Sequence, residues 1–314
     1  MTPRAVLAAG LVVAAAGLVA CDGGSGADRG APGTAAPTTP TTAGAGAHLA
    51  ARPYRYELRT ETFVDPGRPA RRADGTVVAP ERTLVTDVYV PRGEGPFPVI
   101  AFAHGLAGHP RKFRAQLLAR WAEAGYVVAA PAFPLTNDEA PTVDAGAYAD
   151  QPADLVFVLD RVLATVPQAD AGRVGVAGFS LGTSTALAVG FNTCCRDPRV
   201  DAVGAFSTLR PPFDGEYEFS GRPLLLVHGT GDPALPYSGT AELYALAAPP
   251  KFLFGLDDAT HAPPFEDAPS PHDELVGALT VEFWDAYLLG DAGARERLAR
   301  TRPGGGLARV EVTP

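Results

Sequence analysis

The sequence predicts an α/β domain with a mostly parallel central sheet and helices on both faces. Short apolar segments, typical of strands buried on both faces, alternate five times with segments of helical periodicity. The chain has 314 residues, 46% of them hydrophobic and 19% charged, enough to bury the core of one domain of about 250 residues. Strands that alternate with helices in this way form a parallel sheet, because each helix returns the chain to the edge where the preceding strand began.

The first twenty residues are typical of an export signal. Arg4 is followed by sixteen apolar or glycine residues, Ala5–Ala20, which suit the hydrophobic region of a signal peptide and are few for a membrane span. The segment ends in Leu18-Val19-Ala20-Cys21, which resembles the lipobox of bacterial lipoproteins, where the cysteine is acylated and becomes the first residue of the mature chain. We expect a signal peptide over residues 1–20 and lipidation of Cys21. The alternative is a plain secretory signal cut near Ala20.

Residues 21–47 are rich in Gly, Ala, Thr and Pro and show no hydrophobic periodicity, so we expect a disordered tether. Two or more acyl chains on Cys21 would anchor the protein stably, whereas one would not. The expected location is the outer face of a bacterial cell membrane, or outside the cell if the chain is not lipidated.

Composition narrows the functional classes. The formal net charge is −9 and no basic cluster occurs, which argues against a nucleic-acid partner. Three cysteines are too few for a disulfide-built scaffold. Cys194 and Cys195 are adjacent, and in an exported protein they could form a disulfide or remain thiols; we expect a structural disulfide. No further cysteine or histidine cluster accompanies them, so no metal site is expected. The oligomeric state is not predicted.

The folded domain is expected over residues 48–302, followed by a C-terminal tail at 303–314. Tyr54–Val64 and Thr83–Val90 alternate as antiparallel strands do, with a turn region between them at Asp65–Pro80. Further strands are predicted at 99–104, 126–133, 174–177, 200–207, 224–228 and 251–256. Helices are predicted at 113–124, 150–166, 181–189, 238–247 and 273–289, with another turn or two at 295–300. We expect the polar loop 137–149 to border the functional site.

The sharpest turn in the sequence is Gly178-Phe179-Ser180-Leu181-Gly182, between a buried strand and a helix of small residues. This is the G-x-S-x-G pattern of a nucleophile elbow. A strand that reverses into a helix within so few residues forces the serine toward sparsely populated backbone angles, and side chains at the flanking positions would clash. We therefore expect Ser180 to be a nucleophile. The alternative is an ordinary strand-to-helix turn with a solvated serine.

A serine hydroxyl needs a base and a group that orients the base, and the order expected for this elbow is serine, acid, histidine. Asp232 follows the strand 224–228, and His261 follows the next strand, 251–256. Both therefore lie at the carboxyl edge of the sheet, where Ser180 also lies. Asp257 and Asp258 remain alternatives for the acid.

The other histidines are weaker candidates for the base. His228 comes before the acid and is expected to be a structural residue or to support the acid from behind. His272 stands beside Pro271 at a helix start and is expected at the surface. His48 and His109 fall outside the expected position.

Acyl transfer also needs two backbone N–H groups to stabilise the oxyanion. One is expected from Leu181, directly after the nucleophile. The other is expected from Leu106, in the segment His104-Gly105-Leu106-Ala107-Gly108 that follows the strand 99–104. A tight turn that merely requires glycine is compatible with the same sequence.

Together, GFSLG, HGLAG, VHGTGD and DATH resemble the α/β-hydrolase family over roughly Tyr54 to Leu289. Within it the chain is similar to dienelactone-hydrolase-like esterases, to platelet-activating-factor acetylhydrolase-like enzymes and, more loosely, to cutinase-type polyester hydrolases. The resemblance implies an α/β-hydrolase fold and the catalytic roles of Ser180, Asp232 and His261, with oxyanion donors at Leu106 and Leu181. Dienelactone hydrolase itself uses a cysteine nucleophile, so its substrate does not carry over.

Only sixteen residues separate Ser207 from Leu224, too few for a helical cap, so an open site is expected. The sequence thus predicts a serine esterase that needs no cofactor or metal, acting on bulky, lipid or polymeric esters. The alternatives are a serine peptidase or amidase with the same triad, and a non-catalytic lipoprotein that binds a ligand.

Overall fold

The computed structural model describes residues 51–304 and 306–314. The predicted signal peptide, Cys21, the tether over 21–47, His48 and the start of the domain lie outside the described residues. Within the described part of the chain, no helix has the length and apolar character needed to cross a membrane.

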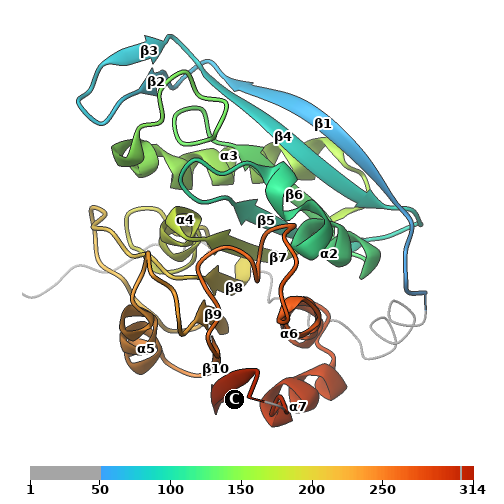
Figure 1. Ribbon diagram of the computed structural model, residues 1–314. Coiled ribbons are helices and arrows are strands. Elements are labelled where there is room, and N and C mark those ends of the chain that lie inside the picture. Colours follow the sequence, from blue (N-terminus) through green and yellow to red (C-terminus); the bar gives the residue numbers. More distant parts are fainter. Residues whose placement is uncertain (1–50, 305) are drawn as a thin grey trace, which may run out of the picture. The chain divides into compact units, whose positions relative to one another are not determined.

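The described residues form a nine-stranded sheet with the strand order β1-β4-β6-β5-β7-β8-β9-β10-β11 (Figure 1). The six neighbouring strands from β6 to β10 run parallel, whereas β1, β4 and β11 pair antiparallel. The bounds are β1 Tyr56–Asp65, β4 Arg82–Pro91, β5 Phe97–Ala103, β6 Val127–Ala132, β7 Ala169–Phe179, β8 Val200–Phe206, β9 Leu224–Gly229, β10 Lys251–Leu256 and β11 Ala308–Thr313. The sheet confirms the predicted mostly parallel α/β architecture.

Helices cover both faces of the sheet, as Figure 1 shows. α3 (Gln151–Thr165), α4 (Leu181–Phe191) and α5 (Tyr237–Leu246) share one apolar core with the sheet, and α2 (Ala119–Glu123), α6 (Asp273–Tyr287) and α7 (Ala292–Arg300) share the other. Side chains alternate along β5, so Ile100 and Phe102 enter the core beneath α6 while Val99 and Ala101 enter the core beneath α3. Burial on both faces explains the continuous apolar strand sequences.

The predicted helix over 113–124 is divided into three pieces. A 3-10 turn, η1 (Pro110–Phe113), and a π turn, η2 (Arg114–Leu118), precede α2. The carboxylate of Asp267 accepts hydrogen bonds from the N–H groups of Ala115 and Gln116, at 2.9 to 3.0 Å. The buried side-chain amide of Gln116 also donates to the carbonyl of Pro264, at 3.2 Å. These contacts with a distant loop replace the regular helical pattern.

The prediction of a C-terminal tail over residues 303–314 is wrong for most of that segment. Residues 308–313 form β11, which pairs with β10 from Lys251↔Thr313 to Leu256↔Ala308. Ala308, Val310 and Val312 pack against the core, and the residues between them are exposed. The folded domain therefore continues past residue 302, because the outer edge of β10 has backbone groups and apolar surface that this strand covers. Similarly, the predicted turn region 65–80 contains a short hairpin, β2 (Ala70–Arg71) with β3 (Val77–Ala79).

Arg52 fixes the beginning of the described chain to the sheet and to α6. Its guanidinium donates to both carboxylate oxygens of Asp285, at 2.5 and 2.6 Å, and to the carbonyl of Ala124 at 2.7 Å. The hydroxyl of Tyr126 donates to the same carboxylate, at 2.5 Å. Because Asp285 is buried, these contacts compensate for removing its charge from water.

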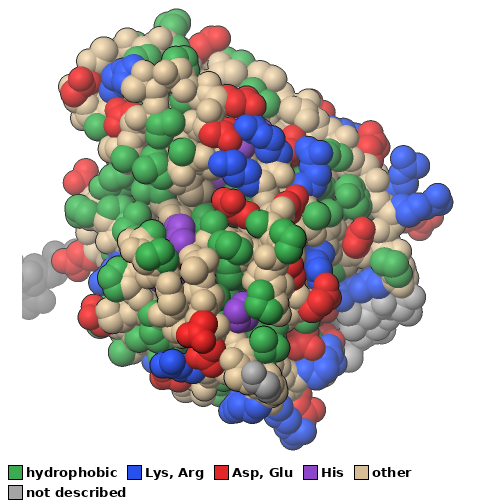
Figure 2. Space-filling model, viewed as in Figure 1, with side chains coloured by type: hydrophobic (Ala, Val, Ile, Leu, Met, Phe, Trp, Pro, Cys, Tyr) green, Lys and Arg blue, Asp and Glu red, His purple; other side chains and the backbone are tan. Residues whose placement is uncertain are grey.

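The surface carries both signs of charge. On the face shown in Figure 2, acidic and basic side chains are intermixed, with hydrophobic side chains between them. Several surface side chains of opposite charge form ion pairs, among them Arg111–Asp138 at 2.7 Å and Lys112–Asp138 at 3.3 Å.

Candidate active site

Ser180 lies between the end of β7 and the start of α4, with φ 52° and ψ −120°. Its backbone N–H donates to the carbonyl of Phe206 on β8, at 2.9 Å, which holds this strained conformation. A Cβ atom at Gly178 would lie 2.1 Å from the carbonyl oxygen of Gly182, and one at Gly182 would lie 2.0 Å from that of Ala103. The two glycines are therefore required by close backbone contacts, as the elbow pattern predicts.

Three side chains from separate strand ends meet at this edge of the sheet. Nε2 of His261 lies 2.9 Å from Oγ of Ser180, and Nδ1 of His261 lies 2.6 Å from Oδ2 of Asp232. The imidazole of His261 is partly exposed, at 22%, whereas the carboxylate of Asp232 is fully buried. The arrangement forms a continuous hydrogen-bonded chain from an accessible hydroxyl to a buried acid.

Asp232 stays charged because its loop supplies donors. Oδ1 accepts hydrogen bonds from the N–H groups of Ala234 and Leu235, at 2.8 and 3.0 Å. Burial alone would raise the pKa of this carboxyl, but the bonds from His261 and from these two backbone groups outweigh it, and the pKa lies below its usual range. The charged form is thus available to stabilise a protonated His261.

The segment after β5 passes directly beside the nucleophile. A Cβ atom at Gly105 would lie 3.1 Å from Cβ of Ser180. Within the described structure, the N–H of Leu106 has no acceptor. Leu181 is the first residue of α4, so its N–H is one of those that a helix leaves without an internal partner. Both groups predicted as oxyanion donors are therefore available to a ligand.

A protein-family model described as Chlorophyllase matches residues 67–209, which are 143 of the 314 residues. The matched segment contains Leu106 and the elbow around Ser180 and ends before Asp232 and His261. Together with the sheet order and the elbow, this partial match supports one conclusion. The described residues have an α/β-hydrolase fold. No curated protein matches the chain.

The positions of the remaining histidines differ in part from the predictions. His228 is buried and its Nε2 lies 3.1 Å from Oδ2 of Asp232, so it touches the acid rather than the serine. His272 is only 4% exposed, so its predicted surface position is wrong. It immediately precedes α6, and its backbone N–H donates to Oγ of Ser270, at 3.2 Å. His109 accepts the N–H of Arg111 at the start of η1.

The alternative acids lie elsewhere. The carboxylate of Asp257 accepts a hydrogen bond from Arg309, at 2.9 Å. Asp258 has a positive φ of 55°, and its N–H donates to Thr230, at 3.1 Å. Among the described residues, Asp232 is the acid bonded to His261.

His104 has a role that sequence reasoning missed. Its Nε2 accepts the N–H of Phe133, at 3.0 Å, so the proton is on Nδ1, which donates to the carbonyl of Gly105, at 2.7 Å. Complete burial lowers the pKa of His104 to about 4, which keeps it neutral. This side chain holds the loop of Leu106 against β6. The only available signal was a histidine directly before the glycine of that loop.

In the described structure, the connection between β8 and β9 supplies no helical cap over the site. The segment 208–223 contains no helix and is tied to α4, where the N–H of Leu209 donates to Oγ1 of Thr183, at 2.8 Å. The hydroxyl of Tyr148 donates to the carbonyl of Pro212, and its ring packs edge-on against Phe213. The predicted loop 137–149, which is partly a 3-10 turn, η3 (Ala145–Asp150), therefore touches the segment 208–223.

Two further features lie away from the triad. Cys194 and Cys195 form a disulfide after α4, where the N–H of Cys194 donates to the side chain of Asn192, at 2.9 Å.

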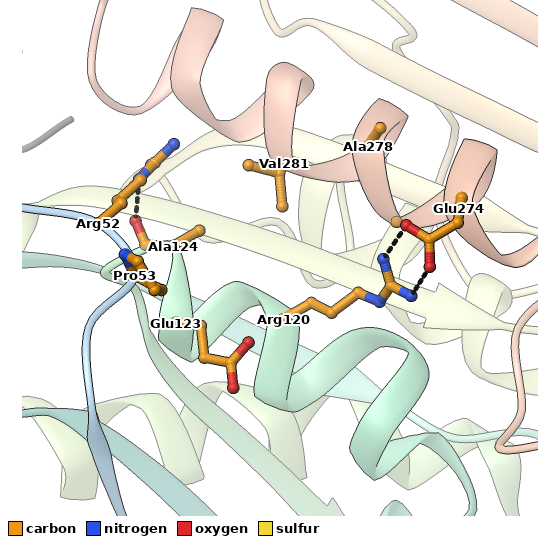
Figure 3. Close-up of a pocket in the computed structure, with 9 residues that line it drawn as sticks. Arg52, Pro53, Arg120, Glu123, Ala124, Glu274, Ala278 and Val281 are labelled. Carbon is orange, nitrogen blue, oxygen red and sulfur yellow. Dashed lines mark hydrogen bonds and ion pairs between the residues drawn. The ribbon is translucent and has the colours of Figure 1, made fainter. Parts of the chain in front are cut away.

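A groove of about 400 Å³ lies between α2 and α6, beside Arg52 and the ion pair of Arg120 with Glu274 (Figure 3). Its lining contains none of the triad residues. Among the described residues, no group of His, Cys, Asp and Glu could hold a metal ion.

Proposed function

We propose that the protein is a serine hydrolase that cleaves carboxylic esters through an acyl-enzyme on Ser180. The observation that carries this proposal is the chain of hydrogen bonds from Ser180 through His261 to Asp232, at 2.9 and 2.6 Å. The match to Chlorophyllase, an ester hydrolase family, supports ester chemistry in general.

In the first half-reaction, Nε2 of His261 takes the proton of Ser180 as Oγ attacks the ester carbonyl carbon. The N–H groups of Leu106 and Leu181 stabilise the negative charge that develops on the carbonyl oxygen. The bond to the alcohol oxygen then breaks, and His261 returns the proton to the departing alcohol. Asp232 stabilises the imidazolium while it exists, and itself stays ionised.

In the second half-reaction, His261 takes a proton from a water molecule, whose oxygen attacks the acyl carbonyl. The same two N–H groups stabilise the second oxyanion. The bond to Oγ breaks, His261 returns the proton to Ser180, and the carboxylic acid leaves. Each half-reaction uses the same geometry, so no other group is needed for proton transfer.

The substrate class we propose is a bulky, lipid or polymeric ester. Support comes from the helix-free segment 208–223 and from the side chain of Leu106, which is 45% exposed beside the nucleophile. The resemblance to platelet-activating-factor acetylhydrolase-like and cutinase-type enzymes favours the same class. Activity restricted to small soluble esters, with large esters and polyesters untouched, would contradict this part of the proposal.

The site of action is proposed to be the outer face of a bacterial membrane, through lipid on Cys21. We expect Cys21→Ser to move the protein from the membrane fraction to the soluble exported fraction, because the thiol that carries the lipid is lost. Fractionation after expression in a bacterial host, with ester hydrolysis followed in both fractions, measures this. Equal membrane association of the wild type and the variant would contradict lipidation at Cys21.

The catalytic proposal is tested by labelling with a fluorophosphonate and by turnover of matched ester and amide substrates. Ser180→Ala should abolish labelling and lower kcat by roughly 10⁶-fold, as loss of a triad nucleophile does. Ser238→Ala, an exposed serine on α5, is the control and should behave as wild type. Labelling that survives Ser180→Ala would overturn the nucleophile assignment. Faster turnover of the amide would indicate a peptidase, and a wild type that neither labels nor turns over would indicate a binding protein.

A further inference from the structure

His228 completes a hydrogen-bonded set around the acid of the triad. Oδ2 of Asp232 lies 3.1 Å from Nε2 of His228 and 2.6 Å from Nδ1 of His261, so one oxygen faces two imidazoles. His228 is fully buried at the end of β9, where Leu235 supplies a carbonyl oxygen 3.1 Å from the same Nε2. The position of the proton on His228 matters, because it decides whether the ring can donate a hydrogen bond to Asp232.

The surroundings of His228 decide its tautomer. Thr208 donates its backbone N–H to Nδ1, at 3.2 Å, so Nδ1 is an acceptor without a proton. The hydroxyl of Thr240, 2.5 Å from the same nitrogen, is then also a donor. The proton of a neutral His228 therefore lies on Nε2, where Oδ2 of Asp232 and the carbonyl oxygen of Leu235, each 3.1 Å away, share it. Burial holds the pKa of His228 below its usual range despite the neighbouring carboxylate, so the ring stays neutral.

We propose that His228 is a positioning residue for the triad: its Nε2–H group fixes the carboxylate of Asp232 and moderates its attraction for the proton on His261. The inference rests on the proposed serine hydrolase function. With the N–H groups of Ala234 and Leu235 on Oδ1, Asp232 receives donors on both oxygens and cannot rotate. A neutral donor supplies this restraint without a second positive charge beside His261.

Because Oδ2 of Asp232 is shared by both imidazoles, the loss of His228 should shift the pH dependence of labelling in a definite direction. A donor from His228 draws electron density from Oδ2 and so weakens the stabilisation of protonated His261. Removing that donor should favour the protonated form of His261 and move the acid limb of Ser180 labelling to higher pH. Two other titratable groups lie near the rings: Glu266, whose charge acts on His261, and Tyr237 of α5, whose ring packs edge-on against His228 at 5.9 Å.

The experiment follows the pH dependence of fluorophosphonate labelling of Ser180 in the purified full chain, because labelling needs His261 as a base but no ester substrate. His228→Leu removes the donor and should move the acid limb up by about half to one pH unit. It should also slow labelling roughly tenfold or more, well short of the ~10⁴-fold effect of neutralising a triad acid. His228→Gln, whose amide can donate to the same oxygen, should restore both.

Thr240→Val is the matched structural control. It disturbs the packing of His228 from the other side but leaves the N–H of Thr208 on Nδ1, so the acid limb should stay at its wild-type pH even if the melting temperature falls. Glu266→Gln removes a negative charge near His261 and should move the limb in the opposite direction, to lower pH. A solely structural role for His228 would lower the melting temperature of both His228→Leu and Thr240→Val without moving either limb.

Two outcomes overturn the proposal. One is an acid limb in His228→Leu that stays in place or moves down. The other is ¹⁵N NMR of the wild type showing the proton of His228 on Nδ1. If Ser180 of the wild type is not labelled at any pH, the proposed function fails and this inference fails with it. The NMR tautomer distinguishes the two failures, since it reports on His228 without any reaction.

Discussion

His104 links the loop that contains Leu106 to the pH dependence of stability. Because its pKa falls from an ordinary 6.5 to about 4 on folding, the unfolded chain binds a proton at this position between these values and the folded chain does not. Stability from a neutral His104 is complete above pH 6.5 and declines as the pH falls toward 4. The full difference is roughly 3 kcal/mol.

We therefore expect His104→Gln to flatten the fall in unfolding free energy between pH 6.5 and 4, leaving the part that other groups contribute, among them His109 and His228, whose pKa values burial also lowers. Urea unfolding of both proteins at several pH values in this range measures it. The same slope in variant and wild type would show that His104 is protonated in the folded state.

Sequence spacing predicted which side chains meet, because the carboxyl ends of parallel strands share one edge. Ser180, Asp232 and His261 each follow a different strand, and that order sufficed. The contact of His228 with Asp232 fits its expected supporting role, but the backbone partners of His104 and His228 could not be predicted, since each is an N–H from a distant segment, Phe133 or Thr208. Residue type alone does not report such a partner.

At the scale of single elements, two helical glycines have opposite surroundings. A Cβ atom at Gly182 in α4 would lie 2.0 Å from the carbonyl oxygen of Ala103, whereas one at Gly239 in α5 would have no neighbour within 4 Å. The first glycine allows α4 to approach β5 beside the nucleophile. The second only gives the unfolded chain more conformational freedom.

Gly182→Ala should therefore destabilise the fold and reduce labelling of Ser180, because α4 must move away from β5. Gly239→Ala should stabilise it by about 0.5–1 kcal/mol through helix propensity. Thermal and urea unfolding of the two variants measure the contrast. Equal effects in both would mean that α4 does not pack against β5 as described.

The elements that sequence reasoning missed lie where long-range contacts override local patterns. Residues 308–312 alternate in polarity, Ala-Arg-Val-Glu-Val, which is a strand signal, but a six-residue segment after a glycine run gives no sign that β10 needs a partner. The π turn at Arg114–Leu118 depends on Asp267, which is 151 residues from Gln116. No local window contains both partners.

For the folded domain as a whole, Arg52 ties the first described residues to the buried carboxylate of Asp285. Arg52→Ala would leave the buried carboxylate of Asp285 with Tyr126 and without its guanidinium partner. We expect a loss of about 2–3 kcal/mol in unfolding free energy, because a charged group would lose its main donor.

Urea unfolding measures this loss, with Arg55→Ala as the control, since Arg55 is an exposed neighbour expected to change stability by less than about 0.5 kcal/mol. Equal effects of the two substitutions would show that the fold begins after Arg52.

The helix-free connection between β8 and β9 has a kinetic consequence. The connection, residues 208–223, contains no helix, so it supplies no helical lid that would have to open before an ester reaches Ser180. The proposed hydrolase should therefore begin turnover without a lag and treat dispersed and aggregated molecules alike. A lipid–water interface would supply substrate but would not increase the activity of the enzyme.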